Sequence, residues 1–238
     1  MKSLTAFWNK HPDQTAFVLG SGPSLNKANV YKLHAKGIVI TVNSAVMHDN
    51  YPDYHVITDG AAPYLQSFDL VVASNAVVAC SSDVSSRGLV PDDRLLQFTK
   101  KPYAPMGLQT NYLSQSITAV ITAAHLAIVL GCKRIVLVGC DCTHKEGKRY
   151  FYDFWNPPGD DPMVNAFLKT GFERPYRNII GGDKPAQEYI VGNGPSSGSE
   201  IRAWNAVVKL IPSSVSILDA SDSRLDCFPK VQIGDILK

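Results

Sequence analysis

Short runs of apolar residues, separated by glycine, asparagine and aspartate, recur along the chain. Continuous runs without polar alternation are typical of parallel strands that are buried on both faces. Seven runs predict strands: residues 15–20, 37–43, 54–59, 70–73, 76–80, 134–139 and 215–218.

Longer segments between these runs carry helix signals. Residues 114–130 are rich in Ala, Ile, Leu and Val without strand alternation, which predicts a buried helix that ends before Gly131. A capping-box spacing at 197–200 predicts a helix to about residue 210. Strands and helices that alternate in this way predict an α/β fold, Rossmann-like, with a mainly parallel sheet flanked by helices.

The pattern changes from about residue 143 to about residue 190. Aromatic residues gather at 150–155, and prolines, a glycine and two aspartates follow them. We expect an aromatic-rich, lid-like insertion in a single nucleotide-binding domain over residues 1–238. A subunit contact in a homo-oligomer is the alternative, because both would use exposed aromatic side chains.

Composition excludes several classes of protein. Lys plus Arg number 23 and Asp plus Glu 21, and this near-balance argues against a nucleic-acid-binding protein. Apolar runs stay far below the ~20 residues of a membrane span, and the first residues lack the apolar stretch of a signal peptide. Five sparse cysteines predict reduced thiols and a cytoplasmic protein.

The strongest chemical signal is the loop that follows the first predicted strand. It consists of Gly20, Ser21, Gly22, Pro23 and Ser24. Glycines let a phosphate approach the backbone closely, and the start of the following helix favours an anion. The loop therefore predicts nucleotide binding, although Leu25 occupies the last glycine position of a dinucleotide fingerprint. The alternative is a tight strand-to-helix turn without a ligand.

Polar residues also end three other predicted strands. Asn43 can bind a base or ribose through its amide, and Asp59 can hold a hydroxyl group. Each can instead cap a turn. Asp141 follows the strand at 134–139, so we expect it at the same edge of the parallel sheet.

A metal site is the less favoured interpretation of the residues around Asp141. Cys140, Cys142 and His144 would supply three zinc ligands on one face of a continuing strand. A fourth ligand is not evident, so buried thiols at a strand end are favoured and no metal is expected.

Several segments, in order, resemble a known family. Residues 17–25, Asn43 and residues 130–141 resemble the bacterial sialyltransferases of glycosyltransferase family 42 and the related domains of the archaeal hydroxymethylpterin pyrophosphokinase group. The sialyltransferase resemblance implies a Rossmann-like sheet, a CMP-linked sugar donor and no metal. It implies that the loop and Asn43 contact the nucleotide and that Tyr150 steadies the leaving phosphate. Residues 220–225 look like the family's closing strand-end motif.

The sequence departs from this family where the family holds its general base. The family histidine falls near Gly192 and Asn193, and no histidine follows His144. A base must take the proton from an acceptor hydroxyl, and His144, Asp59 and Asp141 are the nearby options. The fuller acidic and histidine pattern of the pyrophosphokinase relatives is also missing.

These observations favour a metal-independent, nucleotide-sugar-dependent glycosyltransferase, sialyltransferase-like, that needs no cofactor and acts on a surface glycan. Its partners would be the nucleotide sugar and the glycan acceptor, and Tyr150, His144 and Asp141 would carry the reaction. Two alternatives stay open. One is a phosphotransferase or pyrophosphokinase that uses ATP and Mg²⁺. The other is a non-catalytic nucleotide-binding module that has lost its base.

Overall fold

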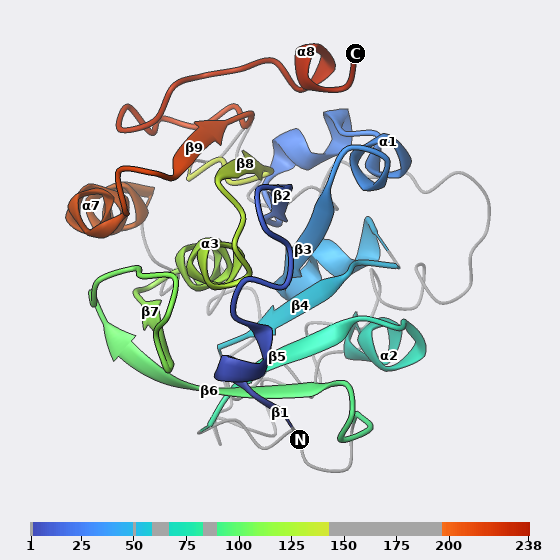
Figure 1. Cartoon of the computed structure of the whole chain (residues 1–238). Coiled ribbons are helices and arrows are strands. Elements are labelled where there is room, and N and C mark those ends of the chain that lie inside the picture. The colour runs from blue at the N-terminus through green and yellow to red at the C-terminus, as the bar shows by residue number, and fades with distance from the viewer. Residues whose placement is uncertain (1, 50, 59–66, 83–89, 143–196) are drawn as a thin grey trace, which may run out of the picture.

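The computed structural model describes residues 2–49, 51–58, 67–82, 90–142 and 197–238. Within these ranges the chain forms a nine-stranded sheet in the order β1-β6-β5-β4-β3-β2-β8-β9, with β7 paired to β6 (Figure 1). All pairings are parallel, which confirms the predicted α/β class. The strands are β1 (Lys2–Ser3), β2 (Thr15–Leu19), β3 (Ile38–Val42), β4 (Tyr54–Ile57), β5 (Val77–Ser81), β6 (Leu95–Pro102), β7 (Tyr112–Gln115), β8 (Arg134–Val138) and β9 (Ser216–Asp219).

Helices cover both faces of the sheet, with α3 and α7 on one side and α1 and α2 on the other (Figure 1). The α-helices are α1 (Val30–His34), α2 (Ser67–Ala73), α3 (Ala119–Val129), α7 (Ser197–Val207) and α8 (Ile233–Ile236). Short 3₁₀ helices are η1 (Leu4–Phe7), η2 (Pro23–Lys27), η3 (Asn43–Met47) and η6 (Val208–Leu210).

The two faces of β2 explain why its apolar run is continuous. Ala16 and Val18 pack into the core with α3 and with Trp204 of α7. Phe17 and Leu19 pack into a second cluster that includes Leu33 of α1. A strand that is covered on both faces needs apolar residues at every position. The runs predicted at 15–20, 37–43, 54–59, 76–80, 134–139 and 215–218 are confirmed, with differences of one or two residues at their ends.

The strand predicted at residues 70–73 is wrong, because these residues lie in helix α2. Arg94 stabilises the end of this helix: its guanidinium donates to the carbonyl oxygens of Val71 at 2.8 Å and Val72 at 3.1 Å. Carbonyl groups in the last turn of a helix have no partner within the helix. The pattern of the run itself gives no sign of this distant partner.

Helix α3 is the buried helix that the sequence predicts, but it begins at Ala119 rather than at residue 114. Residues Tyr112–Gln115 form strand β7 instead. All residues of α3 are buried, and Thr118 caps its first turn. Gly131 follows the helix with φ +93°, as its predicted C-terminus requires.

The side chains of α3 satisfy the backbone of β7. His125 Nδ1 accepts a hydrogen bond from the Ser114 N–H at 2.7 Å, so Nε2 carries the proton and donates to the Gly107 carbonyl at 3.2 Å. Thr122 Oγ1 donates to the Ser114 carbonyl at 3.1 Å. Burial lowers the pKa of His125 to about 4. His125 is therefore a neutral, structural group.

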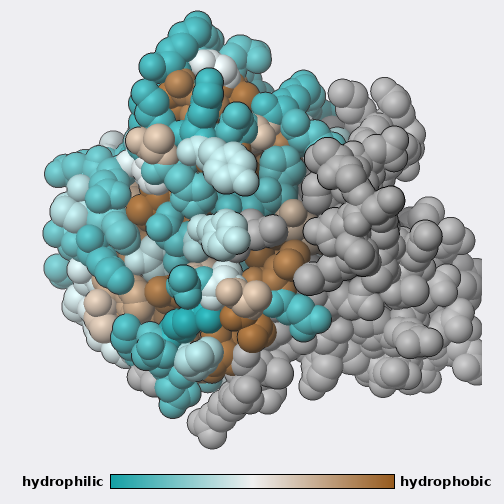
Figure 2. All heavy atoms as spheres, turned by 90° about the vertical axis from the view of Figure 1, so that its right-hand side faces the viewer, coloured by the Kyte–Doolittle hydropathy of each residue, from teal (hydrophilic) through white to brown (hydrophobic). Residues whose placement is uncertain are grey.

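The surface over α1 and α2 is largely hydrophilic, as Figure 2 shows. Apolar side chains also reach this face, and several lie next to one another in its lower part (Figure 2). In the ranges that the structure describes, no helix has the length and apolar character needed to cross a bilayer.

Candidate functional site

The carboxyl ends of β2 and β8 meet at the point where the strand order reverses. From β2 the chain adds β3, β4, β5 and β6 on one side, and it then crosses over to add β8 and β9 on the other. Ligands of open parallel sheets bind outside such a switch point, near the loops that follow its strands. The loop of residues 20–24 follows β2, so the structure places it where the sequence predicts a binding site.

This loop packs directly on the segment that follows β8. The Gly20 N–H donates to the Val138 carbonyl at 2.8 Å, and the Gly22 N–H donates to the Gly139 carbonyl at 2.7 Å. A Cβ atom at Gly22 would lie 2.1 Å from Asp141 Oδ2 and 2.7 Å from the Gly139 oxygen. Contact within the protein therefore already requires glycine at this position.

Most amide groups of the loop are engaged within the protein. The Ser24 N–H donates to Asp141 Oδ2 at 2.9 Å, the Leu25 N–H donates to the Gly22 carbonyl at 3.1 Å, and Pro23 has no N–H. Ser21 differs, because its N–H has no hydrogen-bond acceptor among the described residues. Its hydroxyl oxygen is buried there without a partner as well. Ser21 is thus the loop residue whose N–H and hydroxyl are both without a protein partner in the described part of the chain.

Asp141 joins the loops that follow three strands. It lies after β8, and it accepts hydrogen bonds from the Ser24 N–H after β2 and, at 3.0 Å, from the Asp222 N–H after β9. Only 3% of Asp141 is exposed. Burial raises the pKa of its carboxyl group, and the hydrogen bonds from Ser24 and Asp222 act in the opposite direction. The catalytic role predicted for Asp141 stays a prediction.

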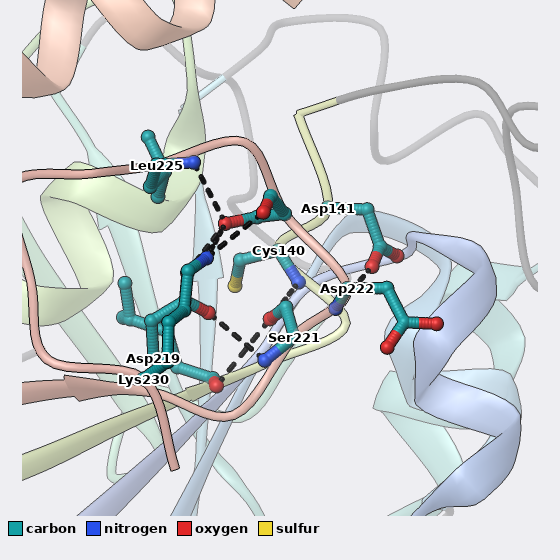
Figure 3. A network of polar contacts seen from close by, with 9 residues as sticks. Cys140, Asp141, Asp219, Ser221, Asp222, Leu225 and Lys230 are labelled. Atoms are coloured by element: carbon teal, nitrogen blue, oxygen red, sulfur yellow. Dashed lines mark hydrogen bonds and ion pairs between the residues drawn. The ribbon is translucent and has the colours of Figure 1, made fainter. Parts of the chain in front are cut away.

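A second buried aspartate fixes the turn that carries Asp222 (Figure 3). Asp219 at the end of β9 is fully buried, and its carboxylate accepts the Ser221 N–H at 2.9 Å and pairs with Lys230 at 2.5 Å. The hydroxyl of Ser223 also donates to this carboxylate. Ser221 Oγ accepts the Cys140 N–H at 2.8 Å. These contacts connect the end of β9 to the segment that holds Asp141.

Sequence analysis gave no role to Asp219 or Lys230, and it noted Ser221 only as part of residues 220–225, which resemble the family's closing motif. A usable signal was present, because Asp219 ends a predicted apolar run and is followed by small polar residues. Polar side chains at a strand end commonly bind the backbone of the next turn. Lys230, eleven residues further on, gives no such signal.

Asn43 lies at the carboxyl end of β3, beside β2 in the sheet, and its side chain is exposed. Its φ is +50°, a left-handed conformation that asparagine adopts more readily than most residues. Its position is the one expected of a nucleotide contact, and the contact itself stays a prediction.

The other predicted site residues, Asp59, His144 and Tyr150, lie outside the described residues. The same holds for the insertion at 143–190 and for the segment around Asn193. The predictions on these residues therefore stay predictions.

The zinc interpretation does not fit the described part of the site. Strand β8 ends at Val138, so Cys140 and Cys142 do not continue it. Burial raises the pKa of both thiols, so without a metal ion they are neutral thiols. The described residues contain no group of three or more His, Cys, Asp or Glu side chains placed to hold a metal ion.

Residues 1–147 match the family model described as MptE-like, 6-hydroxymethylpterin diphosphokinase MptE-like. The chain belongs to the MptE-like family. This membership confirms the pyrophosphokinase side of the resemblance, and it covers β1 to β8, including the loop at 20–24 and Asp141. No curated protein matches the chain.

Two solved structures of the sialyltransferase CstII from Campylobacter jejuni are among the structural neighbours. The one in complex with the substrate analogue cytidine-5'-monophosphate shares 12% identity and covers 92% of this chain and 85% of its own, with a TM-score of 0.48. The one with a trisaccharide acceptor and CMP shares 14% identity and covers 92% and 86%, with a TM-score of 0.45. Similarity at this level says nothing about activity.

Proposed function

We propose that this chain is a transferase that binds a nucleotide donor at the switch point, and that the donor is a nucleotide sugar. Support comes from the loop at 20–24, which lies where parallel sheets bind phosphates and leaves the two donors of Ser21 without a partner among the described residues. The ordered resemblance of residues 17–25, Asn43 and 130–141 to family 42 sialyltransferases supports a sugar donor, with CMP as the favoured nucleotide.

One observation carries the choice of a sugar donor over a diphosphate donor. Transfer of a diphosphate group from ATP uses Mg²⁺, which takes carboxylate oxygens as protein ligands. Asp141 after β8 and Asp219 at the end of β9 are buried and bound by donors of the protein itself, and Asp222, which follows β9, is paired with Lys27. None of these three acids presents a carboxylate without a protein partner to a metal, whereas the phosphate of a departing nucleotide can be stabilised by hydrogen-bond donors of the protein.

The chemistry assigned to each residue follows from its donors. Ser21 N–H and Oγ would bind the phosphate that departs with the nucleotide, and charge that develops there would be stabilised by these oriented dipoles. Tyr150 would donate a further hydrogen bond to the same phosphate, and His144 or Asp59 would take the proton of the acceptor hydroxyl.

The family membership favours a second function, diphosphate transfer from ATP to a pterin-like alcohol. It would need a metal site built around acids other than Asp141 and Asp219, and Asp59, two residues after β4 in the sequence, is the candidate. This function predicts nucleotide binding that depends on Mg²⁺.

Titration calorimetry with CMP and ATP, each with and without Mg²⁺, separates the two functions. The proposal expects CMP to bind equally well in both conditions. Ser21→Ala should weaken CMP binding by about tenfold, because it removes a hydrogen bond to a charged group. Binding of ATP only in the presence of Mg²⁺ would favour the diphosphokinase, and binding of neither nucleotide would overturn both functions.

A further inference from the structure

The carboxylate of Asp141 is the central acceptor of the candidate site. It binds amides that are 117 and 81 residues away in the sequence, one on each side of it. A carboxylate that accepts a hydrogen bond on each oxygen is held in one orientation. The carboxylate also fixes the positions of its two partners, the amides of Ser24 and Asp222.

The position of Asp141 relative to the loop is also fixed by close packing. Gly22 leaves the space that Asp141 Oδ2 occupies, since a Cβ there would lie 2.1 Å from this oxygen. The neighbouring Gly22 and Gly20 amides bind the backbone just before Asp141. Movement of Asp141 would therefore change the path of the loop that presents Ser21.

The turn after β9, which binds Asp141 through the Asp222 amide, is itself held by several hydrogen bonds and an ion pair. The turn at 220–223 is bound to the Asp219 carboxylate, which is neutralised by Lys230 (Figure 3). Ser221 Oγ binds the Cys140 N–H at 2.8 Å, next to Asp141 in the sequence. The Asp222 side chain points away to an exposed ion pair with Lys27. Its backbone alone binds Asp141.

We propose that Asp141 is a positioning residue that clamps the loops after β2, β8 and β9 together, and that it is not the general base. This inference rests on the proposed function, because the clamped loop is the one assigned to the donor phosphate. A general base needs an oxygen that can reach the acceptor hydroxyl. Both oxygens of Asp141 are bound to backbone amides, and only 3% of the residue is exposed.

Asp141→Asn tests the clamp, because the amide keeps the shape of the side chain but replaces one accepting oxygen by NH₂. Asp222→Asn is the matched control: it also removes one negative charge at the loop junction, yet it keeps the backbone N–H that binds Asp141. Calorimetry should show CMP binding weakened by about tenfold in Asp141→Asn. Cytidine, which has no phosphate, should bind as it does to the unchanged protein. Asp222→Asn should bind CMP no more weakly than the unchanged protein does.

Amide hydrogen exchange provides a measurement that needs no nucleotide. Exchange at the amides of Ser24 and Asp222 should be faster in Asp141→Asn than in Asp222→Asn, while amides in α3 stay unchanged. If the unchanged protein binds neither CMP nor ATP, the proposed function fails, and this exchange experiment still tests the clamp.

Three results would overturn the clamp. The first is unchanged exchange at both amides in Asp141→Asn. The second is equal weakening of CMP and cytidine. The third is unchanged CMP affinity together with loss of donor turnover by 100-fold or more, which would make Asp141 the base.

If Asp141→Asn does not fold, Ser221→Ala replaces it, because it removes the acceptor of the Cys140 N–H and leaves Asp141 intact. Ser221→Ala should weaken the binding of CMP more than the binding of cytidine, and the opposite order would count against the clamp.

Discussion

Acid should destabilise this protein through His125, the imidazole at the centre of α3. Its pKa is about 4 in the folded state, against 6.5 for an ordinary histidine. The unfolded chain therefore binds a proton first as the pH falls, so the stability present above about pH 6.5 is lost progressively toward pH 4. At pH 5 this difference lowers the free energy of unfolding by about 2 kcal/mol. His55 on β4, with a pKa of about 3, adds a loss of similar size.

His125→Asn isolates the contribution of His125. The asparagine oxygen can accept the Ser114 N–H in place of Nδ1, but the bond to Gly107 is lost, so the variant should be less stable at pH 7.5 by about 1–3 kcal/mol. We call the difference in free energy of unfolding between the unchanged protein and a variant the stability gap of that variant. For His125→Asn this gap should be about 2 kcal/mol smaller at pH 5 than at pH 7.5, because the variant has no imidazole to protonate at this position.

Urea unfolding at pH 7.5, 6 and 5, followed by tryptophan fluorescence, measures this gap. Thr122→Val is the control, because it removes a hydrogen bond between the same helix and Ser114 without removing a titratable group. Its gap should not change with pH. A His125→Asn gap that is equally constant would refute the reasoning, since it would mean that His125 does not differ in protonation between the folded and unfolded states.

Three further predictions concern the site. Gly22→Ala should lower the free energy of unfolding by about 1–3 kcal/mol in urea titrations, whereas Gly234→Ala, with no atom within 4 Å of the new Cβ, should not destabilise the protein. Tyr150→Phe should lower donor turnover more than donor affinity in steady-state kinetics, and unchanged turnover would remove Tyr150 from the mechanism. Lys27→Ala should change the free energy of unfolding by less than about 1 kcal/mol, because both side chains of its ion pair with Asp222 are exposed.

The fold could be predicted from the sequence where the residues of one segment are enough to determine its structure. The apolar runs of β2, β3 and β8 reflect burial on both faces, and their positions could be predicted within two residues. Strand β6 was missed because its second half is polar and partly exposed. Helix α2 was taken for a strand because Arg94, which binds its last carbonyls, lies outside the run.

The same limit applies to the site. The loop at 20–24 is recognisable from local residues, and its place after the first long strand is confirmed. That its amides are bound by Asp141 and by the backbone after β8 is a long-range fact, and no local spacing encodes it. The role expected for the helix start as an anion site is accordingly reduced, since Asp141 already occupies the Ser24 amide.

The order of the strands has a consequence for how the chain folds. β2 forms at residues 15–19, but one of its two neighbours in the sheet is β8, which begins at residue 134. A ribosome adds about 5–20 residues per second, so β2 waits for seconds with one edge unpaired. Such contacts, distant in sequence, make parallel sheets slow to fold. The three loops that Asp141 joins come together only after residue 222 is made, so the nucleotide of the proposed function could not stabilise the nascent N-terminal part through the complete junction.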